Sequence, residues 1–139
     1  MILLDLAGHN SLRQWFYKSP LYAIWLYIDG DIAFHNYKGK GRLLDVGCNE
    51  GRGLEIFRKN GFDAEGIELN ENAVAIARQR GFNVYLSTIE NFKPEKLFDV
   101  VVISNVLEHA LDPKDMLKNI HRVLNPDGKV FISCPNQQS

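Results

Sequence analysis

The sequence predicts an α/β fold, a doubly wound parallel sheet with helices on both faces. Short, mostly apolar runs such as residues 43–46 and 98–104 are typical of strands that are buried on both faces, as in parallel sheets. These runs alternate with segments of helical periodicity, which is the pattern of strand–helix–strand units. The first run leads into a glycine-rich loop, residues 47–53, where the backbone can approach a ligand closely.

Composition and charge fit a single domain and exclude several kinds of partner. The 139 residues are 45% hydrophobic, enough for one sizeable core. The formal net charge of -1 gives no basic excess, so we expect no nucleic-acid partner. The most apolar early run, residues 21–28, is too short to span a bilayer, and no signal peptide precedes it. We therefore expect a cytoplasmic protein without a membrane partner.

The two cysteines are predicted to be free thiols. Cys48 follows the first expected strand and Cys134 ends the fifth, with one other strand between them in the sheet. A disulfide cannot span two strand spacings. Their spacing also lacks the pattern of a metal site, so no bound metal is expected.

Residues 1–41 are predicted to form a separate, helical segment ahead of a core at residues 42–139. They are rich in aromatic residues and do not follow the alternation of strands and helices. Ser19 and Pro20 can start a helix that continues to Ile28. Aromatic residues at helical spacing usually belong to a core, so this helix is expected to cover one face of the sheet. The alternative is a lid over the ligand.

The first half of the core contains three expected strands and two helices. A helix from about Leu54 is capped at its end by Asn60 and Gly61. The second strand follows and ends near residue 69, and Asn70 is a suitable N-cap for a helix over residues 71–80. A short third strand is expected at residues 84–86.

The second half contains the clearest strand, residues 98–104, which is rich in β-branched residues and is expected beside the first strand. Pro113 starts a helix with an apolar stripe. Residues 125–128 predict a turn into a fifth strand at residues 129–134. Crossovers are right-handed and the glycine loop should open where the strand order reverses, so the predicted order is 3-2-1-4-5.

Two acidic residues indicate the chemistry of the ligand. Asp45 lies two residues before the first glycine, Gly47, where its carboxylate would repel a pyrophosphate and attract a cation. Glu68 ends the second strand about twenty residues beyond the loop, where an acid can accept hydrogen bonds from ribose hydroxyls. S-adenosylmethionine (SAM) carries an ammonium, a sulfonium and a ribose, but no phosphate.

Residues 45–53, DVGCNEGRG, and 66–70, GIELN, resemble the class I SAM-dependent methyltransferases. More narrowly, they are similar to the small-molecule branch that includes the ubiquinone-biosynthesis O-methyltransferases. The resemblance covers residues 42–136 and implies a Rossmann-like fold. It also implies methylation of oxygen or nitrogen on a small-molecule acceptor, with S-adenosylhomocysteine (SAH) as product.

The resemblance further implies where the cofactor binds. The expected cofactor-binding residues are Asp45, Gly47, Cys48, Asn49, Gly51, Glu68, Leu69, Thr88, Ile89, Glu90, Ser104 and Asn105. In relatives an acid commonly stands where this chain has Thr88, so adenine contact there is expected from the Ile89 backbone. Glu90 is more simply the cap of a following helix than an adenine ligand. Asn49 stands where relatives often have glycine, and asparagine tolerates a left-handed backbone.

His109 is the candidate catalytic residue, because an imidazole can take a proton from a hydroxyl acceptor. The simpler alternative is that His109 only anchors the helix of its loop. Asn105, Glu108 and His109 stand at helical offsets and could share a face that binds a metal ion, as in some relatives. Asn105 replaces a glutamate of those relatives, so the metal is not expected.

The chain departs from the family by lacking the further helix and strands 6 and 7 after residue 134. The fifth strand is then an open edge. The chain is expected either to self-associate through this strand or the helix before it, or to cover the edge with its aromatic N-terminal segment. A cofactor-binding module without activity, either regulatory or a fragment of a larger methyltransferase, is therefore an alternative function. A nicotinamide-dependent dehydrogenase is disfavoured by Asp45 and Asn49.

Overall fold

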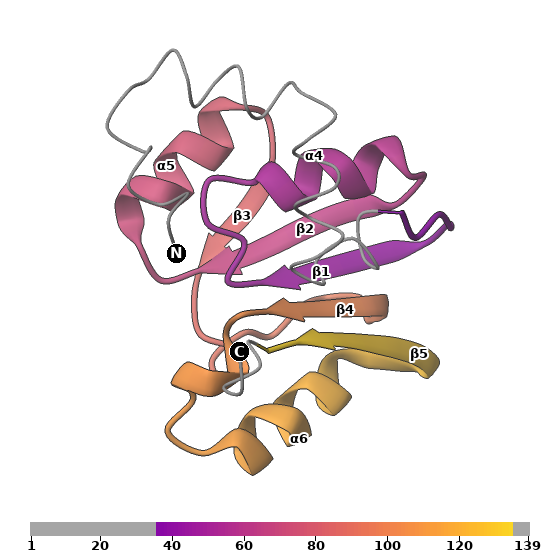
Figure 1. Cartoon of the computed structure of the whole chain (residues 1–139), viewed down its shortest axis with the longest axis vertical. Helices are drawn as coiled ribbons and strands as arrows, with labels where there is room; N and C mark the ends of the chain where they lie inside the picture. Colours follow the sequence, from indigo (N-terminus) through magenta and orange to yellow (C-terminus); the bar gives the residue numbers. More distant parts are fainter. Residues whose placement is uncertain (1–35, 135–139) are drawn as a thin grey trace, which may run out of the picture. The chain divides into compact units, whose positions relative to one another are not determined.

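The computed structural model describes residues 36–134, which form a five-stranded sheet with helices on both faces (Figure 1). The chain divides into two units, Met1–Ala33 and Phe34–Ser139, and the described residues belong to the second. The helix and lid expected within residues 1–35 lie outside the described residues. The division of the chain at residues 41 and 42 stays a prediction.

All five strands are parallel and lie in the order β3-β2-β1-β4-β5. Their bounds are β1 Arg42–Val46, β2 Asp63–Glu68, β3 Asn83–Leu86, β4 Phe98–Ser104 and β5 Leu124–Ser133. This confirms the doubly wound fold and the predicted strand order. The glycine loop leaves β1 next to β4, where the order reverses, so the carboxyl ends of these two strands flank the predicted site.

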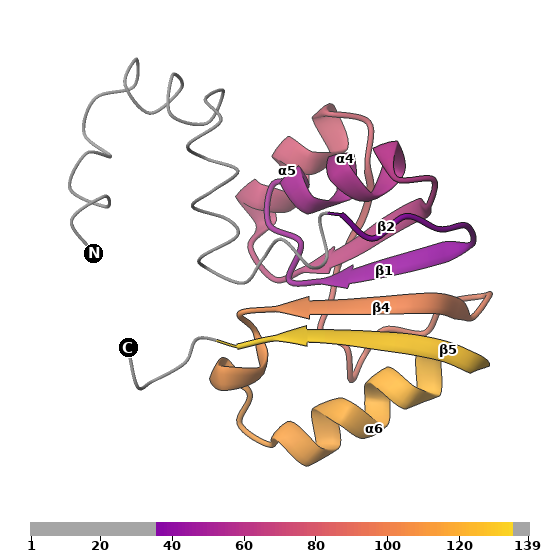
Figure 2. The same cartoon turned by 45° about the vertical axis from the view of Figure 1, so that its right-hand side comes forward.

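The helices cover both faces of the sheet, with α4 and α5 on one face and α6 on the other (Figure 2). Their bounds are α4 Arg52–Lys59, α5 Glu71–Gln79 and α6 Pro113–Val123, and a short 3₁₀ helix, η2, spans Leu107–His109. Adjacent strand residues point to opposite faces: Leu43 packs with α4 and α5, and Leu44 with α6. The two cores explain why β1 and β4 are mostly apolar on both faces.

Helix boundaries follow the capping residues. The Asn70 side chain accepts hydrogen bonds from the backbone N–H groups of Asn72 and Ala73, as predicted for an N-cap. Asp112 caps α6 in the same way, which the sequence analysis did not identify. Asn60 ends α4, and Gly61 has the left-handed backbone expected after it, with φ of +105°.

The fifth strand begins at Leu124 and not at Lys129 as predicted. Leu124 pairs with Phe98 and Lys129 pairs with Val100, so β5 advances five residues while β4 advances two. The predicted turn at residues 125–128 is thus an irregularity inside the strand. The Asn125 side chain donates a hydrogen bond of 2.9 Å to Asp99 on β4, which holds this bulge against its neighbour.

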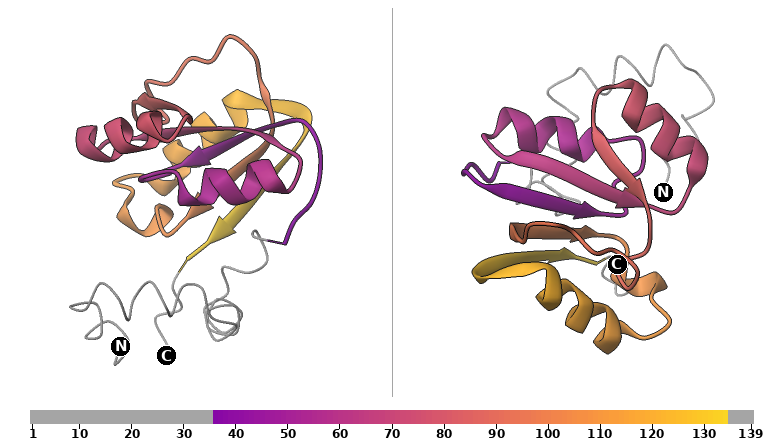
Figure 3. Two further views of the ribbon diagram at one scale, coloured as in Figure 1. Left: turned by 90° about the horizontal axis from the view of Figure 1, so that it is seen from above. Right: turned by 180° about the vertical axis from the view of Figure 1, so that it is seen from behind.

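The connection from β3 to β4 contains no helix (Figure 3). The expectation that Glu90 caps a helix here is therefore wrong, and the Glu90 side chain is exposed. A turn forms instead, in which the Thr88 hydroxyl accepts from the Asn91 N–H at 3.3 Å and the Thr88 carbonyl from Phe92 N–H at 3.0 Å. The apolar Ile89 and Phe92 are buried and anchor the turn under the sheet.

The two faces of β5 differ in their cover. Phe131 lies under Tyr37, a residue of the N-terminal segment, with ring centroids 4.8 Å apart. On the other face Val130 and Ile132 remain 37% and 42% exposed. Self-association through this edge stays a prediction. None of the helices in residues 36–134 has the length and apolar character needed to cross a membrane.

Candidate functional site

The glycine loop after β1 is held open by left-handed backbone at three positions, Gly47, Asn49 and Gly51, with φ of +75°, +50° and +83°. Asn49 adopts the conformation predicted for it. The Gly47 and Cys48 N–H groups both donate to the Ile67 carbonyl, at 2.9 and 3.2 Å. The loop is therefore fixed against the end of β2 and leads directly into α4.

Close packing explains why glycine occupies the ends of this loop. A Cβ on Gly47 would lie 2.6 Å from the Val106 methyl group, and one on Gly53 would lie 2.9 Å from the Asp45 carboxylate. Both distances are too short for real contacts. The backbone of the loop thus passes between the segment after β4 and the acid at the end of β1.

Cys48 offers only its backbone to a ligand. Its side chain is buried in the core beneath α4 and α5, where the sulfur lies against Gly66 of β2. Burial, together with the charges of Asp45 and Glu68, raises the pKa of this thiol to about 12. Both cysteines are free, and β4 separates the strands that they follow, as predicted.

Asp45 is the most unusual charged residue of the site. It is only 7% exposed, and no hydrogen-bond donor within residues 36–134 reaches its carboxylate. Burial, and secondarily the negative charge of Glu68, raises the pKa of Asp45 to about 7. A buried acid without a partner is costly in a folded chain unless a cation can approach it.

Glu68 is instead well supplied with donors. One carboxylate oxygen accepts from the Asn49 N–H at 2.9 Å, and the other from Leu69 and Asn70 at 2.7 and 2.9 Å. Glu68 therefore connects the glycine loop to the end of β2. The sequence analysis proposed only a ribose contact and missed this organising role, although an acid beside a helix start is a local signal for it. Leu69, next to it, is 66% exposed.

The loop after β3, which is predicted to hold adenine, is bonded to α6 by Arg122, a residue not identified from the sequence. The Arg122 guanidinium donates to the carbonyls of Ile89 and Phe92, both at 2.9 Å. Ile89 itself is buried, at 2% exposed. Its carbonyl is occupied, so a cofactor contact at Ile89 is left to its N–H group.

The segment after β4 begins with Ser104 and Asn105. Asn105 has left-handed backbone, with φ of +55°, and its N–H donates to the Ser133 carbonyl of β5 at 2.9 Å. Since Asn105 lies outside η2, the helical offsets that would place it on one face with Glu108 and His109 do not apply. Residues 36–134 hold no cluster of three His, Cys, Asp or Glu side chains suited to a metal ion.

His109 stands at the end of η2 with its side chain 78% exposed. Its imidazole lies 3.9 Å from the Glu108 carboxylate, and the backbone N–H of His109 donates to the Val106 carbonyl at 3.0 Å. The side chain is thus accessible to an acceptor above the sheet. Its role as a base stays a prediction.

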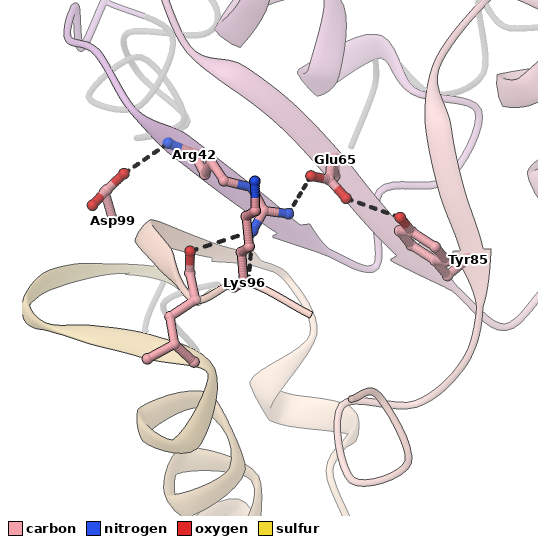
Figure 4. Close-up of polar contacts among 6 residues, drawn as sticks. Arg42, Glu65, Tyr85, Lys96 and Asp99 are labelled. Atoms are coloured by element: carbon pink, nitrogen blue, oxygen red, sulfur yellow. Dashed lines mark hydrogen bonds and ion pairs between the residues drawn. The ribbon is translucent and has the colours of Figure 1, made fainter. Parts of the chain in front are cut away.

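An open hollow of about 890 Å³ lies at the opposite, amino ends of β1, β2 and β3. Its buried charges pair with each other: Arg42 donates to Glu65 at 2.5 Å, and Glu65 also accepts from the Tyr85 hydroxyl at 3.1 Å (Figure 4). Arg42 further donates to the Lys96 carbonyl at 2.6 Å. This network joins three strands and pairs the hollow's buried carboxylate, Glu65, within the fold. The glycine loop and the reversal of strand order lie at the carboxyl ends, so we place the candidate site there.

The fold and the loop at the β1–β4 switch point define a class of cofactor-binding α/β protein, and comparison gives the family. The sequence profile of the Methyltransferase domain family matches residues 31–139, so the chain belongs to that family. This confirms the family recognised from residues 45–53 and 66–70.

Individual relatives agree with the family. The chain is 33% identical over 118 residues to a ubiquinone biosynthesis O-methyltransferase of Coxiella burnetii, covering 80% of this chain and 49% of the relative. The same enzyme of Rickettsia conorii is 32% identical over 138 residues, covering 95% and 46%. The chain therefore spans about half the length of the curated relatives it matches.

Solved structures share the fold. The plantazolicin methyltransferase BpumL, crystallised with a pentazolic substrate analogue and SAH, matches with a TM-score of 0.64 at 22% identity, covering 86% of this chain and 50% of that one. A TehB-like SAM-dependent methyltransferase of Corynebacterium glutamicum matches with a TM-score of 0.60 at 28% identity, covering 75% and 59%.

Proposed function

We propose that the chain binds SAM at the carboxyl ends of β1 and β2, and that it transfers the methyl group to oxygen or nitrogen of a small-molecule acceptor. The observation that supports this most is Asp45, a buried carboxylate that receives no hydrogen bond from residues 36–134 and lies beside a loop of left-handed backbone. Such a site repels phosphate and suits a cationic, nucleoside-like ligand. The family membership and the names of the relatives agree with it.

The residues present fit the cofactor. Asp45 supplies negative charge for the cationic amino-acid part, and Glu68 retains acceptor capacity for the ribose hydroxyls. Gly47 and Gly51 hold the loop in its left-handed conformation, where a Cβ would meet Val106 or Phe82, so the loop keeps the shape that presents its backbone to the cofactor. The remaining assignments are those from the sequence: Leu69, Thr88, Ile89 and Glu90 near adenine, Cys48 and Asn49 in the loop, and Ser104 and Asn105 near the methionine end.

Bound SAM would supply an electrophilic methyl group on a sulfonium. The chain's own contribution is mainly to align the cofactor with the acceptor, since methyl transfer depends chiefly on geometry. His109, exposed beyond β4, is the group that could take a proton from a hydroxyl acceptor. We keep a small molecule as acceptor, and no nucleic acid, because the formal net charge is -1. We also keep the cytoplasm as the location, and both are predictions.

The second candidate is a cofactor-binding module without catalysis. The chain spans about half the length of its curated relatives, so catalysis by this chain is a proposal separate from cofactor binding. Both candidates require the same cofactor site. They differ only in turnover.

Calorimetric titration of the chain at pH 8 tests the cofactor site. We expect SAH to bind and NAD⁺ not to bind, because Asp45 opposes a pyrophosphate. Binding of NAD⁺ but not SAH would contradict the proposal and restore the dehydrogenase. A second assay then follows SAH released from SAM with small phenols and amines as acceptors. Binding of SAH without any turnover would favour the module.

A further inference from the structure

The carboxyl group of Asp45 is in a setting that disfavours its charge. It lies at the end of the central strand β1, between Gly66 of β2 and Val102 of β4. On the face towards α4 its oxygen lies beside the backbone of Gly53. Asp45 is only 7% exposed, and these neighbours supply no hydrogen bond to its carboxyl group.

The charged and titratable groups around Asp45 further disfavour its charged form. Glu68, at the end of β2, is the charge that acts on it, and it is negative. The Cys48 thiol of the loop stays neutral, because burial raises its pKa to about 12. Arg52, the first residue of α4, is exposed, and the residue of β4 that pairs with Asp45 is the apolar Val102. No cation within residues 36–134 forms an ion pair with Asp45.

We propose that Asp45 holds a proton in the free chain near neutral pH and releases it when the ammonium-bearing part of SAM or SAH binds. The carboxylic O–H bond breaks, the proton passes to solvent, and the carboxylate then faces the cation of the ligand. This inference rests on the proposed cofactor site and deepens it. Cofactor binding becomes coupled to pH, with binding stronger in mildly alkaline solution.

The size of the coupling follows from the setting. Burial raises the pKa of Asp45 to about 7 in the free chain. A cation within a few ångströms lowers the pKa of a carboxyl group again, by stabilising the charged form. Between the two values, affinity should fall about tenfold for each unit of decreasing pH, because the proton competes with the ligand.

Calorimetry of the 139-residue chain with SAH tests this, in buffers of low and high ionisation enthalpy at pH 6, 7 and 8. A group with a pKa of about 7 should release about 0.9, 0.5 and 0.1 protons per SAH at these three values. The dissociation constant should be about tenfold larger at pH 6 than at pH 8. The Asp45→Asn variant should bind SAH more weakly, without proton release and without this pH dependence.

Two controls assign the proton. His109→Gln removes the exposed imidazole near the site and should leave proton release unchanged; loss of release in this variant would overturn the assignment to Asp45. The ligand 5′-methylthioadenosine lacks the amino-acid part and should bind without releasing a proton. Release with this ligand would overturn the role given to the ammonium.

A direct titration completes the test. Carbon NMR of labelled aspartate should show the Asp45 carboxyl titrating near pH 7 in the free chain and well below that with SAH. A midpoint below pH 5 in the free chain would contradict the inference. SAH binding with no proton release between pH 6 and 8 would contradict the inference and leave the proposed function intact. No SAH binding at any pH would overturn both.

Discussion

Asp45 and Glu68 lie at the carboxyl ends of adjacent strands, but their carboxyl groups differ in the number of hydrogen bonds that they accept. Three backbone N–H groups donate to Glu68, so its charge is compensated within the fold. Asp45 is buried without any such donor among the described residues. Glu68 therefore stabilises the shape of the site. Asp45, in contrast, is available to interact with a cation of the ligand.

The Asp45→Asn variant should stabilise the free chain, and increasingly so as pH rises. The pKa of Asp45 is raised from 3.8 to about 7 in the folded chain. The contribution of protonated Asp45 to the free energy of unfolding is therefore complete below pH 4 and is lost as pH rises through 7. This loss is on the order of 4 kcal/mol. Urea unfolding should show the variant gaining on the wild type from pH 5 to pH 8. Glu90→Gln, at an exposed acid, should show no such gain.

The Glu68→Ala variant should weaken SAH binding by roughly 1.5 to 3 kcal/mol, the range for a lost charged hydrogen bond. Part of the loss comes from the Asn49, Leu69 and Asn70 N–H groups, which lose their acceptor. Calorimetry at pH 8 measures the affinity. Glu71→Ala, three residues further and exposed, is the matched control. Unchanged affinity in the Glu68 variant would refute the ribose assignment.

Among the elements, the β1–loop–α4 unit sets the position of the site. The Ile67 carbonyl of β2 receives two N–H groups of the loop, and Val106 beyond β4 packs against Gly47. Arg122 of α6 fixes the turn after β3, where adenine is predicted to bind. Each wall of the site is thus held by a neighbouring element, and the loop has little room for other conformations.

A comparison of two glycines measures how tightly the loop is packed. Gly47→Ala places a Cβ 2.6 Å from the Val106 methyl group at φ of +75°, whereas Gly81→Ala has φ of +85° and nothing within 4 Å. The Gly81 variant should therefore lose only the backbone strain, about 1 to 2 kcal/mol. The Gly47 variant should lose more stability in urea unfolding and most of its SAH affinity. Equal losses of stability in both variants would contradict this, because they would mean that the Val106 side chain moves aside without cost.

At the scale of the whole described molecule, the two ends of the sheet have different roles. The amino ends are joined by the Arg42, Glu65 and Tyr85 network, in which the Glu65 carboxylate accepts from both of the other side chains (Figure 4). The carboxyl ends carry the glycine loop and both site acids. The β5 edge is a third region: among the described residues β5 pairs only with β4, and its Val130 and Ile132 side chains are partly exposed.

Light scattering over a range of concentrations should show self-association through the β5 edge. Exposed apolar side chains on an unpaired strand favour pairing with a second copy. The Val130→Lys, Ile132→Lys double variant should remain monomeric. Leu69→Lys, which removes an exposed leucine away from β5, should associate as the wild type does. A wild-type chain that is monomeric throughout would contradict this prediction.

The sequence by itself predicted the elements and their order, because the signals are local. Apolar runs marked β1 and β4, Asn70 and Pro113 marked helix starts, and the handedness of crossovers gave the order of the strands. The position of the site followed from the same rules, since loops at the carboxyl ends of β1 and β2 must meet. The family resemblance added the identity of the cofactor.

Tertiary structure alone decided which side chains are free to act. Cys48 points into the core, no donor in the described part of the chain reaches Asp45, and Arg122 bonds to the turn after β3 from 33 residues away. The helical face expected for Asn105 and His109 failed because Asn105 bonds to β5 in a left-handed conformation. Burial and hydrogen-bond partners depend on residues distant in the chain, so no local pattern could reveal them.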